Sequence, residues 1–334
     1  MYKKHHYADA HLDLALDIQK QRELGRNRVI ESDYLDRFEA GGFGVIVSSI
    51  FVQNSFIPEM ALRVALRQIS ALKSDIRESE RVEFCTEYSD VIQAIENRRV
   101  GIMLSMEDCI PLYNDIELLP LMYELGVRFM GLAWNRRNMA CDGSAFVQNG
   151  RSYSLALTPF GQELVKSCIK YGIVIDVSHL NAAGFWDLCN ITDGPIIASH
   201  SNAAAIVPTE RNLTDEQIRE ISVRKGYIGI NGMSFLISGN ESDACVENMV
   251  DHITHIAEIA GTDCIGLGLD MNDSILKHIS ESEKNLVPGQ CRDVIPGHDK
   301  ILILIDEMKK RGFSENETDK ICGGNFLRFL KENF

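Results

Sequence analysis

Short apolar runs alternate along the chain with longer segments in which apolar residues recur at helical spacing. Many of the short runs are rich in Ile and Val and are bounded by Gly, Asn or Asp, which is typical of strands buried on both faces. The predicted strands are Tyr7–Leu14, Phe43–Phe51, Val100–Cys109, Val127–Trp134, Gly172–Leu180, Pro195–Asn202, Gly226–Asn231 and Cys264–Asp270.

The intervening segments carry recognisable helix ends. Thr158 offers an N-cap before Pro159, and proline is favoured at the first helical position. Thr214 and Gln217 have the spacing of a capping box. Apolar residues in Cys245–Gly261 recur at helical spacing, so this segment is also predicted to be a helix.

Eight strands that alternate with helices predict a parallel sheet, and their number favours a closed (β/α)8 barrel of the TIM type. A doubly wound open sheet is the alternative, but no GxGxxG pattern follows the first predicted strand. Because no low-complexity tract or linker divides the sequence, we expect residues 1–334 to form a single barrel domain. Two long polar segments, Asn135–Leu157 and Met271–Pro296, follow the fourth and eighth strands, where barrel enzymes place their active-site loops.

Charge and cysteine usage exclude several classes of protein. The chain has 34 Lys+Arg and 48 Asp+Glu, a formal net charge of −14, and no basic run that would favour nucleic acid as a partner. Its nine cysteines are odd in number, widely spaced and without a CxxC pair, which fits reduced thiols in a cytoplasmic protein. The apolar stretches are too short to span a bilayer, and the first residues leave no room for a signal peptide. We therefore expect a cytoplasmic protein that binds no membrane.

Polar side chains that can bind metals stand at the ends of five predicted strands. His11 and Asp13, two residues apart on the first strand, share one face. Carboxylates or imidazoles also end the third, fifth, sixth and eighth strands; these residues are Glu107, His179, His200 and Asp270. Since the carboxyl ends of parallel barrel strands converge on one rim, these side chains are expected to lie together.

Three histidines and three carboxylates exceed what one tetrahedral zinc ion needs. A pair of metal ions, bridged by one carboxylate and by a water or hydroxide, would use the whole set. None of the candidate ligands at these strand ends is a cysteine, which argues against a structural thiolate site.

With these motifs in this order, the chain resembles the zinc-dependent membrane dipeptidase (renal dipeptidase) family of the amidohydrolase superfamily, in a soluble bacterial-type form. The resemblance runs from His11-Leu-Asp13 to Gly323-Gly-Asn325-Phe-Leu-Arg328 and so covers nearly the whole chain. It implies two zinc ions, with these ligands: His11 and Asp13 on one ion, His179 and His200 on the other, and Glu107 as the bridge.

The same resemblance implies roles in catalysis and in substrate binding. Asp270 corresponds to the family's acid/base aspartate beside the bridging solvent. Arg211 and Asn212 correspond to the segment that binds the terminal carboxylate of the substrate, which suits the two-pronged guanidinium of arginine. The implied reaction is hydrolysis of the peptide bond of a small dipeptide, with a D-residue at the carboxy end as one option.

One position departs from the family pattern. Trp134 stands where animal members carry a histidine that helps to bind substrate and transition state. Tryptophan can donate a hydrogen bond but cannot accept a proton. Asn135 or Asn138 then becomes a substitute for that histidine, with Trp134 either in the substrate site or simply packed against the barrel rim.

Two other functions stay open on the sequence alone. One is a different amidohydrolase reaction in the same barrel: hydrolysis of an N-acyl amino acid or cyclic amide, or a deamination. The other is a barrel that binds a ligand without catalysis. A homodimer is also compatible with the sequence.

Overall fold

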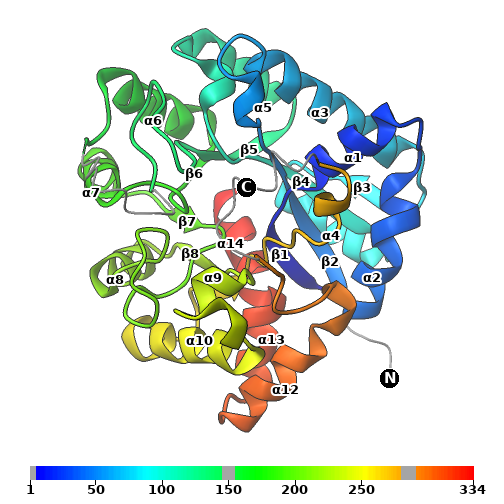
Figure 1. The fold of residues 1–334 in the computed structure, drawn as a ribbon, viewed down its shortest axis with the longest axis vertical. Helices are drawn as coiled ribbons and strands as arrows, with labels where there is room; N and C mark the ends of the chain where they lie inside the picture. Colours follow the sequence, from blue (N-terminus) through cyan, green and yellow to red (C-terminus); the bar gives the residue numbers. More distant parts are fainter. Residues whose placement is uncertain (1–4, 145–154, 280–290) are drawn as a thin grey trace.

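The computed structural model describes residues 5–144, 155–279 and 291–334. Eight parallel strands follow one another around a barrel in the order β1-β2-β4-β5-β6-β7-β8-β9. Their bounds are β1 Tyr7–Leu12, β2 Phe43–Ile50, β4 Val100–Met106, β5 Val127–Gly131, β6 Val174–Asp176, β7 Ile196–Ala198, β8 Tyr227–Ile230 and β9 Ile265–Leu267. The predicted TIM-type barrel is thereby confirmed (Figure 1).

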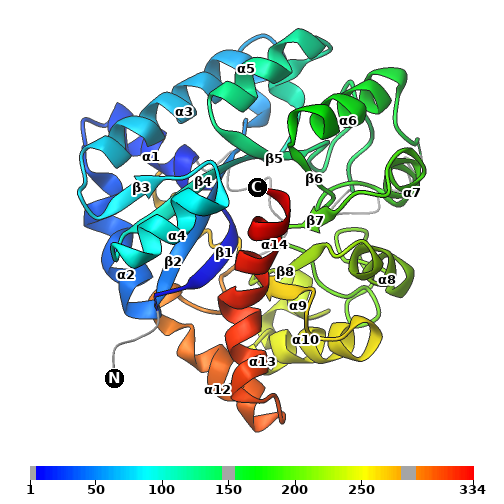
Figure 2. The same cartoon turned by 180° about the vertical axis from the view of Figure 1, so that it is seen from behind.

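Helices cover the outside of the barrel and, in the case of α14, one of its ends (Figures 1 and 2). They are α1 Leu14–Glu23, α2 Leu35–Gly41, α3 Ala61–Arg77, α4 Tyr88–Glu96, α5 Leu119–Glu124, α6 Pro159–Tyr171, α7 Ala182–Ile191, α8 Asp215–Val223, α9 Ser234–Ile237, α10 Val246–Ala260, α12 Leu302–Lys310, α13 Glu315–Asp319 and α14 Asn325–Asn333. The predicted helix ends are confirmed: Thr158 caps α6 through the Gly161 N–H, and Thr214 and Gln217 form the capping box of α8.

The barrel has an inner and an outer apolar layer. Ile46 and Ile50 of β2 belong to the main core, which also contains apolar side chains of the surrounding helices, whereas Val45 and Val47 belong to a separate cluster with Phe326 of α14. Alternate side chains of a strand point to opposite faces, which accounts for this division. Figure 2 shows α14 lying across the end of the barrel nearest the strand starts. That end is closed by packing, and the opposite rim is left for chemistry.

Several strands are shorter than predicted. The fifth predicted strand, 172–180, is reduced to Val174–Asp176, and its polar residues Ser178 and His179 follow the strand instead of belonging to it. Gly172, the first residue of that predicted strand, has a positive φ of 75° and ends α6 instead. A further strand, β3 (Val82–Phe84), was not predicted because three residues with a central Glu carry little pattern; it pairs with the first half of β4.

The two long polar segments are only partly described: 135–144 and 155–157 in the first, 271–279 and 291–296 in the second. The remainder of each prediction lies outside the described residues. Among the helices of the described ranges, none is both long and apolar enough to cross a membrane.

Candidate active site

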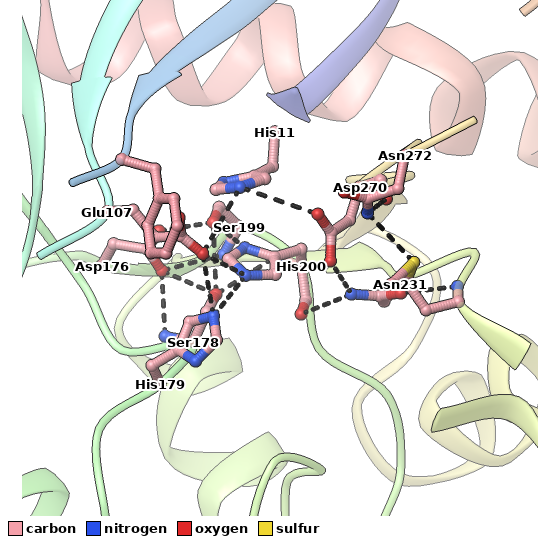
Figure 3. Close-up of polar contacts among 12 residues, drawn as sticks. His11, Glu107, Asp176, Ser178, His179, Ser199, His200, Asn231, Asp270 and Asn272 are labelled. Carbon is pink, nitrogen blue, oxygen red and sulfur yellow. Dashed lines mark hydrogen bonds and ion pairs between the residues drawn. The ribbon is translucent and has the colours of Figure 1, made fainter. Parts of the chain in front are cut away.

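The side chains predicted to bind metal converge at the carboxyl ends of the strands, and Figure 3 shows four of them: His11, Glu107, His179 and His200. His11 belongs to β1, and the other residues lie within three residues after the ends of β1, β4, β6, β7 and β9; they are Asp13, Glu107, His179, His200 and Asp270. Neighbouring strands approach closely here. A Cβ on Gly131 of β5 would collide with the backbone oxygen of Glu107, so this position requires glycine.

One oxygen of Glu107 faces all three histidines. Its Oε1 lies 3.0 Å from Nε2 of His179, 3.6 Å from Nε2 of His200 and 3.8 Å from Nε2 of His11. The Nε2 atoms of His179 and His200 are themselves 2.9 Å apart. Four potential metal-binding atoms thus gather at one point.

These residues form two sets that share Glu107. One set is Glu107, His179 and His200, the other is His11, Asp13 and Glu107, and the ligand atoms within each set lie within 4.8 Å of one another. His11 Nε2 and Asp13 Oδ1 are buried and have no hydrogen-bond partner among the described residues. Buried polar atoms without a partner are costly, and a divalent cation would satisfy both. The donor set therefore fits two metal ions.

Burial disfavours charge on the protein groups of this cluster. It lowers the pKa of His11 to about 3, and it lowers the pKa values of His179 and His200 well below their usual range, with nearby Arg211 adding to the shift. The imidazoles are therefore neutral and able to bind a metal. Burial also raises the pKa values of Asp13 and Glu107 well above their usual range, and the neighbouring carboxylate of Asp270 adds to both shifts.

A hydrogen-bonded chain behind His200 sets its tautomer (Figure 3). The Ser199 hydroxyl donates to Asp176, so its oxygen accepts from Nδ1–H of His200 at 2.7 Å. Nε2 of His200 then carries the lone pair, which points toward the Glu107 carboxylate. Asp176 also accepts from the hydroxyl of Ser178 at 2.8 Å. A carboxylate that orients a metal-binding histidine in this way is a recurrent feature of metal sites.

Asp270 adopts an unusual backbone conformation, with φ at 53°. Its Oδ2 accepts from the side-chain amide of Asn231 at 3.0 Å, while Oδ1 faces Nε2 of His11 at 3.9 Å. Burial raises the pKa of Asp270 to about 6, although the Asn231 hydrogen bond and Arg211 oppose the shift. A carboxyl group with this pKa can both accept and release a proton near neutral pH.

A cavity of about 720 Å³ of empty space, including its mouth, opens beside these candidate metal ligands. Its lining contains six of the residues predicted for the site: Asp13, Glu107, Trp134, His179, Arg211 and Asp270. Trp134 is buried against Phe51, with the ring centroids 4.8 Å apart. Asn135 and Asn212, predicted to bind substrate, are absent from the lining, as is Asn138.

The last two asparagines have structural contacts. Asn212 donates to the backbone oxygens of Val207 and Leu236, at 3.0 and 3.1 Å. Asn138 donates to Asp108 at 2.7 Å and folds the loop that follows β5. Neither of these side-chain amides therefore lies in the cavity as a substitute for the histidine that Trp134 replaces.

Arg211 has more contacts than the sequence predicted. It is 2% exposed, and its guanidinium donates to the backbone oxygens of Ser178 and, at 3.2 Å, His200. Its Nε has no hydrogen-bond partner among the described residues. Arg211 therefore both lines the cavity and fixes the two loops that carry His179 and His200, the histidines predicted to bind metal.

Sequence reasoning missed the residues that support the site, among them Asp9, Asp176, Ser199, Asn231 and His298. Two of them could have been recognised in the sequence. Asp9 and Asp176 are charged residues inside apolar strands, where a buried carboxylate needs polar partners. Asn231 directly follows β8 and carried no comparable signal.

Comparisons with known proteins identify the family of this chain. A family model for membrane dipeptidase (peptidase family M19) matches residues 1–333. The chain belongs to the membrane dipeptidase family. Dipeptidase tcpJ of Claviceps purpurea is 28% identical over 310 residues, which cover 89% of this chain and 68% of that protein. An uncharacterized protein from the pqqA 5′ region of Klebsiella pneumoniae is 29% identical over 280 residues, or 82% of this chain and 98% of that one.

Two solved structures share the barrel. Dipeptidase AC, a metallo peptidase of family M19, has a TM-score of 0.85 and 26% identity, and the match covers 98% of each chain. A metallo peptidase from Rhodobacter sphaeroides, liganded with a phosphinate mimic of the dipeptide L-Ala-D-Ala, has a TM-score of 0.83 and 24% identity, covering 98% of this chain and 99% of that one. The predicted membrane dipeptidase family is confirmed, and it implies a hydrolase with a metal cofactor.

Proposed function

We propose that this membrane dipeptidase family member is a binuclear zinc dipeptidase that hydrolyses the single peptide bond of small dipeptides. The observation that carries the proposal is the position of Glu107, whose Oε1 faces His11, His179 and His200 within 3.8 Å. A carboxylate shared by two ligand sets is what a bridged metal pair requires. The solved relative that holds a phosphinate mimic of a dipeptide supports this substrate class.

The metal ligands proposed are those of the two sets. His11 and Asp13 would hold one zinc ion, His179 and His200 the other, and Glu107 both. When bound, the two ions would supply activation of a water molecule and stabilisation of negative charge on the peptide carbonyl oxygen.

Two other residues complete the reaction. Asp270 would accept the proton of the attacking water at Oδ1, the oxygen that Asn231 leaves open, and deliver it to the leaving amine. Arg211, the sole Lys or Arg among the described residues that line the cavity, would hold the terminal carboxylate of the dipeptide. Trp134 would bound the substrate from the other side of the cavity.

Metal analysis and a substrate panel test the proposal together. We expect about two zinc ions per chain, hydrolysis of dipeptides by the loaded protein, and loss of hydrolysis on chelation. A folded protein without tightly held metal would contradict the metal pair. Turnover restricted to N-acyl amino acids or cyclic amides would instead favour another amidohydrolase reaction, the alternative that Trp134 motivates. Tight binding of dipeptides to loaded protein without cleavage would indicate a binding protein.

A further inference from the structure

One wall of the cavity is apolar and separate from the main core. Leu16, Phe51, Trp134 and Ile275 form an apolar cluster of their own, and Ile279 packs against it. All five side chains line the cavity, so we call them the apolar wall. They come from four separate segments: α1 and the loops after β2, β5 and β9.

The apolar wall and Arg211 belong to different parts of the barrel rim. Arg211 lies in the loop after β7, and in the order of strands around the barrel β7 is farthest from β2, which Phe51 follows; the loops after β5 and β9, which carry Trp134 and Ile275, are each two strands from β7. A dipeptide with its carboxylate at Arg211 would extend through the cavity past the candidate metal ligands, with its N-terminal residue toward the side that Phe51 occupies.

Gln53 supplies a polar group on the same side. It follows β2, lines the cavity and is only 3% exposed. Its Oε1 is buried and has no hydrogen-bond partner among the described residues. An unpartnered acceptor in a ligand cavity calls for a donor from the ligand, and the α-ammonium of a dipeptide is such a donor.

We propose that the apolar wall and Gln53 form the subsite for the N-terminal residue and select dipeptides with a large apolar side chain there. This inference rests on the proposed dipeptidase function. The wall gains contact with each added methylene of the substrate, whereas a charged side chain loses its hydration against it. Gln53 meanwhile accepts a hydrogen bond from the free amino group and disfavours N-blocked substrates.

The test compares kcat/KM of the zinc-loaded protein for Leu-Ala, Ala-Ala, Asp-Ala, Lys-Ala and Ala-Leu. We expect Leu-Ala to exceed Ala-Ala by about 10-fold or more, since three added carbons are buried, and the two charged substrates to be poorest. Ile279→Ser should reduce kcat/KM for Leu-Ala several-fold more than for Ala-Ala. Leu276→Ser, a second half-buried cavity position, should act in the same direction.

Two further variants sharpen the result. Leu121→Ser removes an apolar side chain of α5 that is 45% exposed and absent from the cavity lining, so it should leave the ratio of Leu-Ala to Ala-Ala unchanged. Gln53→Leu keeps the approximate volume but deletes the acceptor, so kcat/KM should fall about 10-fold for every dipeptide with a free amine.

The outcomes separate the two proposals. Dipeptide hydrolysis without preference for Leu-Ala, or with equal loss for Leu-Ala and Ala-Ala in both Ile279→Ser and Leu276→Ser, overturns the subsite and leaves the dipeptidase standing. A preference for Ala-Leu over Leu-Ala assigns the wall to the C-terminal residue and also overturns the inference. Absence of hydrolysis for all dipeptides overturns the proposed function, and the subsite with it.

Discussion

His298 and Asp9 form a buried pair, with Nε2 of the histidine 2.8 Å from Oδ2 of the aspartate, although 289 residues separate them. The other oxygen of Asp9 accepts the backbone N–H groups of His11 at 3.3 Å and Leu269 at 2.8 Å. His11 belongs to β1 and Leu269 to the loop directly after β9, and these two strands lie at the two ends of the strand order, where the barrel closes. Asp9 therefore holds together the backbones that carry His11 and Asp270.

The first prediction concerns this pair. His298→Leu should lower the free energy of unfolding by about 2–4 kcal/mol, because the Asp9 carboxylate loses a hydrogen bond while it stays buried. Urea denaturation measures the loss. The control is His255→Leu, which breaks a partly exposed pair with Asp215 at 2.9 Å and should cost less than about 1 kcal/mol. Equal losses in the two variants would contradict the supporting role of Asp9 and His298.

The second prediction concerns the chain from Asp176 through Ser199 to His200. Ser199→Ala removes the acceptor of His200 Nδ1–H, so the imidazole loses its fixed tautomer and orientation. Zinc affinity, measured by competition with a chromogenic chelator, should fall by roughly 10- to 100-fold. Ser222→Ala, whose hydroxyl donates to Ala260 at 3.3 Å far from the strand ends, should leave the affinity unchanged. If Ser199→Ala binds zinc as tightly as the wild type does, the hydrogen bond from His200 to Ser199 does not orient this histidine for metal binding.

The gathering of the candidate ligands was predictable because it follows from topology. Eight apolar runs that alternate with helices predict the barrel, and a barrel brings its strand ends to one rim. His11, Glu107 and His200 could therefore be placed together without knowledge of the loops. The spacing of two residues between His11 and Asp13 predicted a shared set, and one of the ligand groups contains both.

The supporting contacts could not be predicted, because they depend on loop paths and on partners far apart in sequence. The Asp9–His298 pair carries no local spacing signal. The hydrogen bonds of Arg211 go to backbone oxygens, which look alike at every position of a sequence. β3 pairs with only half of β4, so its three residues show neither a long apolar run nor a clear alternation.

The third prediction concerns Glu107. Glu107→Gln replaces one oxygen with an amide nitrogen and removes the negative charge that both ligand sets share, so zinc content should fall at both sites. His179→Ala should mainly weaken one site and leave close to one zinc ion per chain. Metal analysis after dialysis distinguishes the two patterns. Zinc content in Glu107→Gln equal to that of the wild type would exclude the bridging role.

The fourth prediction concerns Arg211. Removal of a charge-assisted pair worth about 1.5–3 kcal/mol should lower kcat/KM for free dipeptides by roughly 10- to 150-fold in Arg211→Ala. A dipeptide amide lacks the carboxylate, so its kcat/KM should fall less in Arg211→Ala. Because the guanidinium also donates to the backbone oxygens of Ser178 and His200, zinc affinity should fall as well.

Assays at saturating zinc separate the two roles of Arg211. Arg211→Lys should recover only part of the activity, since an ammonium cannot reproduce two parallel hydrogen bonds. If Arg211→Ala at saturating zinc cleaves free dipeptides as well as the wild type does, the carboxylate of the substrate is bound elsewhere.

The last prediction concerns His252, a fully buried histidine of α10. Its Nδ1 accepts the backbone N–H of Ala203 at 3.1 Å, so Nε2–H donates to the backbone oxygen of Ile237 at 3.2 Å. Burial lowers the pKa of His252 to about 4, although the Ile237 contact and Asp251 oppose the shift. The folded state thus favours the neutral imidazole, which joins α10 to the loop after β7 and to the end of α9.

Because the pKa of His252 is lower in the folded than in the unfolded chain, this histidine stabilises the fold at pH values above its unfolded pKa of about 6.5. That contribution is lost as the pH falls toward 4. Between pH 7.5 and pH 5.0 His252 should therefore cost the metal-free protein about 2 kcal/mol of unfolding free energy. His252→Asn keeps an acceptor and cannot take up a proton, so its unfolding free energy should fall by about 2 kcal/mol less over the same interval. Urea titrations of both proteins at the two pH values, with chelator present throughout, measure the difference. Parallel pH dependence in wild type and variant would show that His252 does not contribute to acid destabilisation.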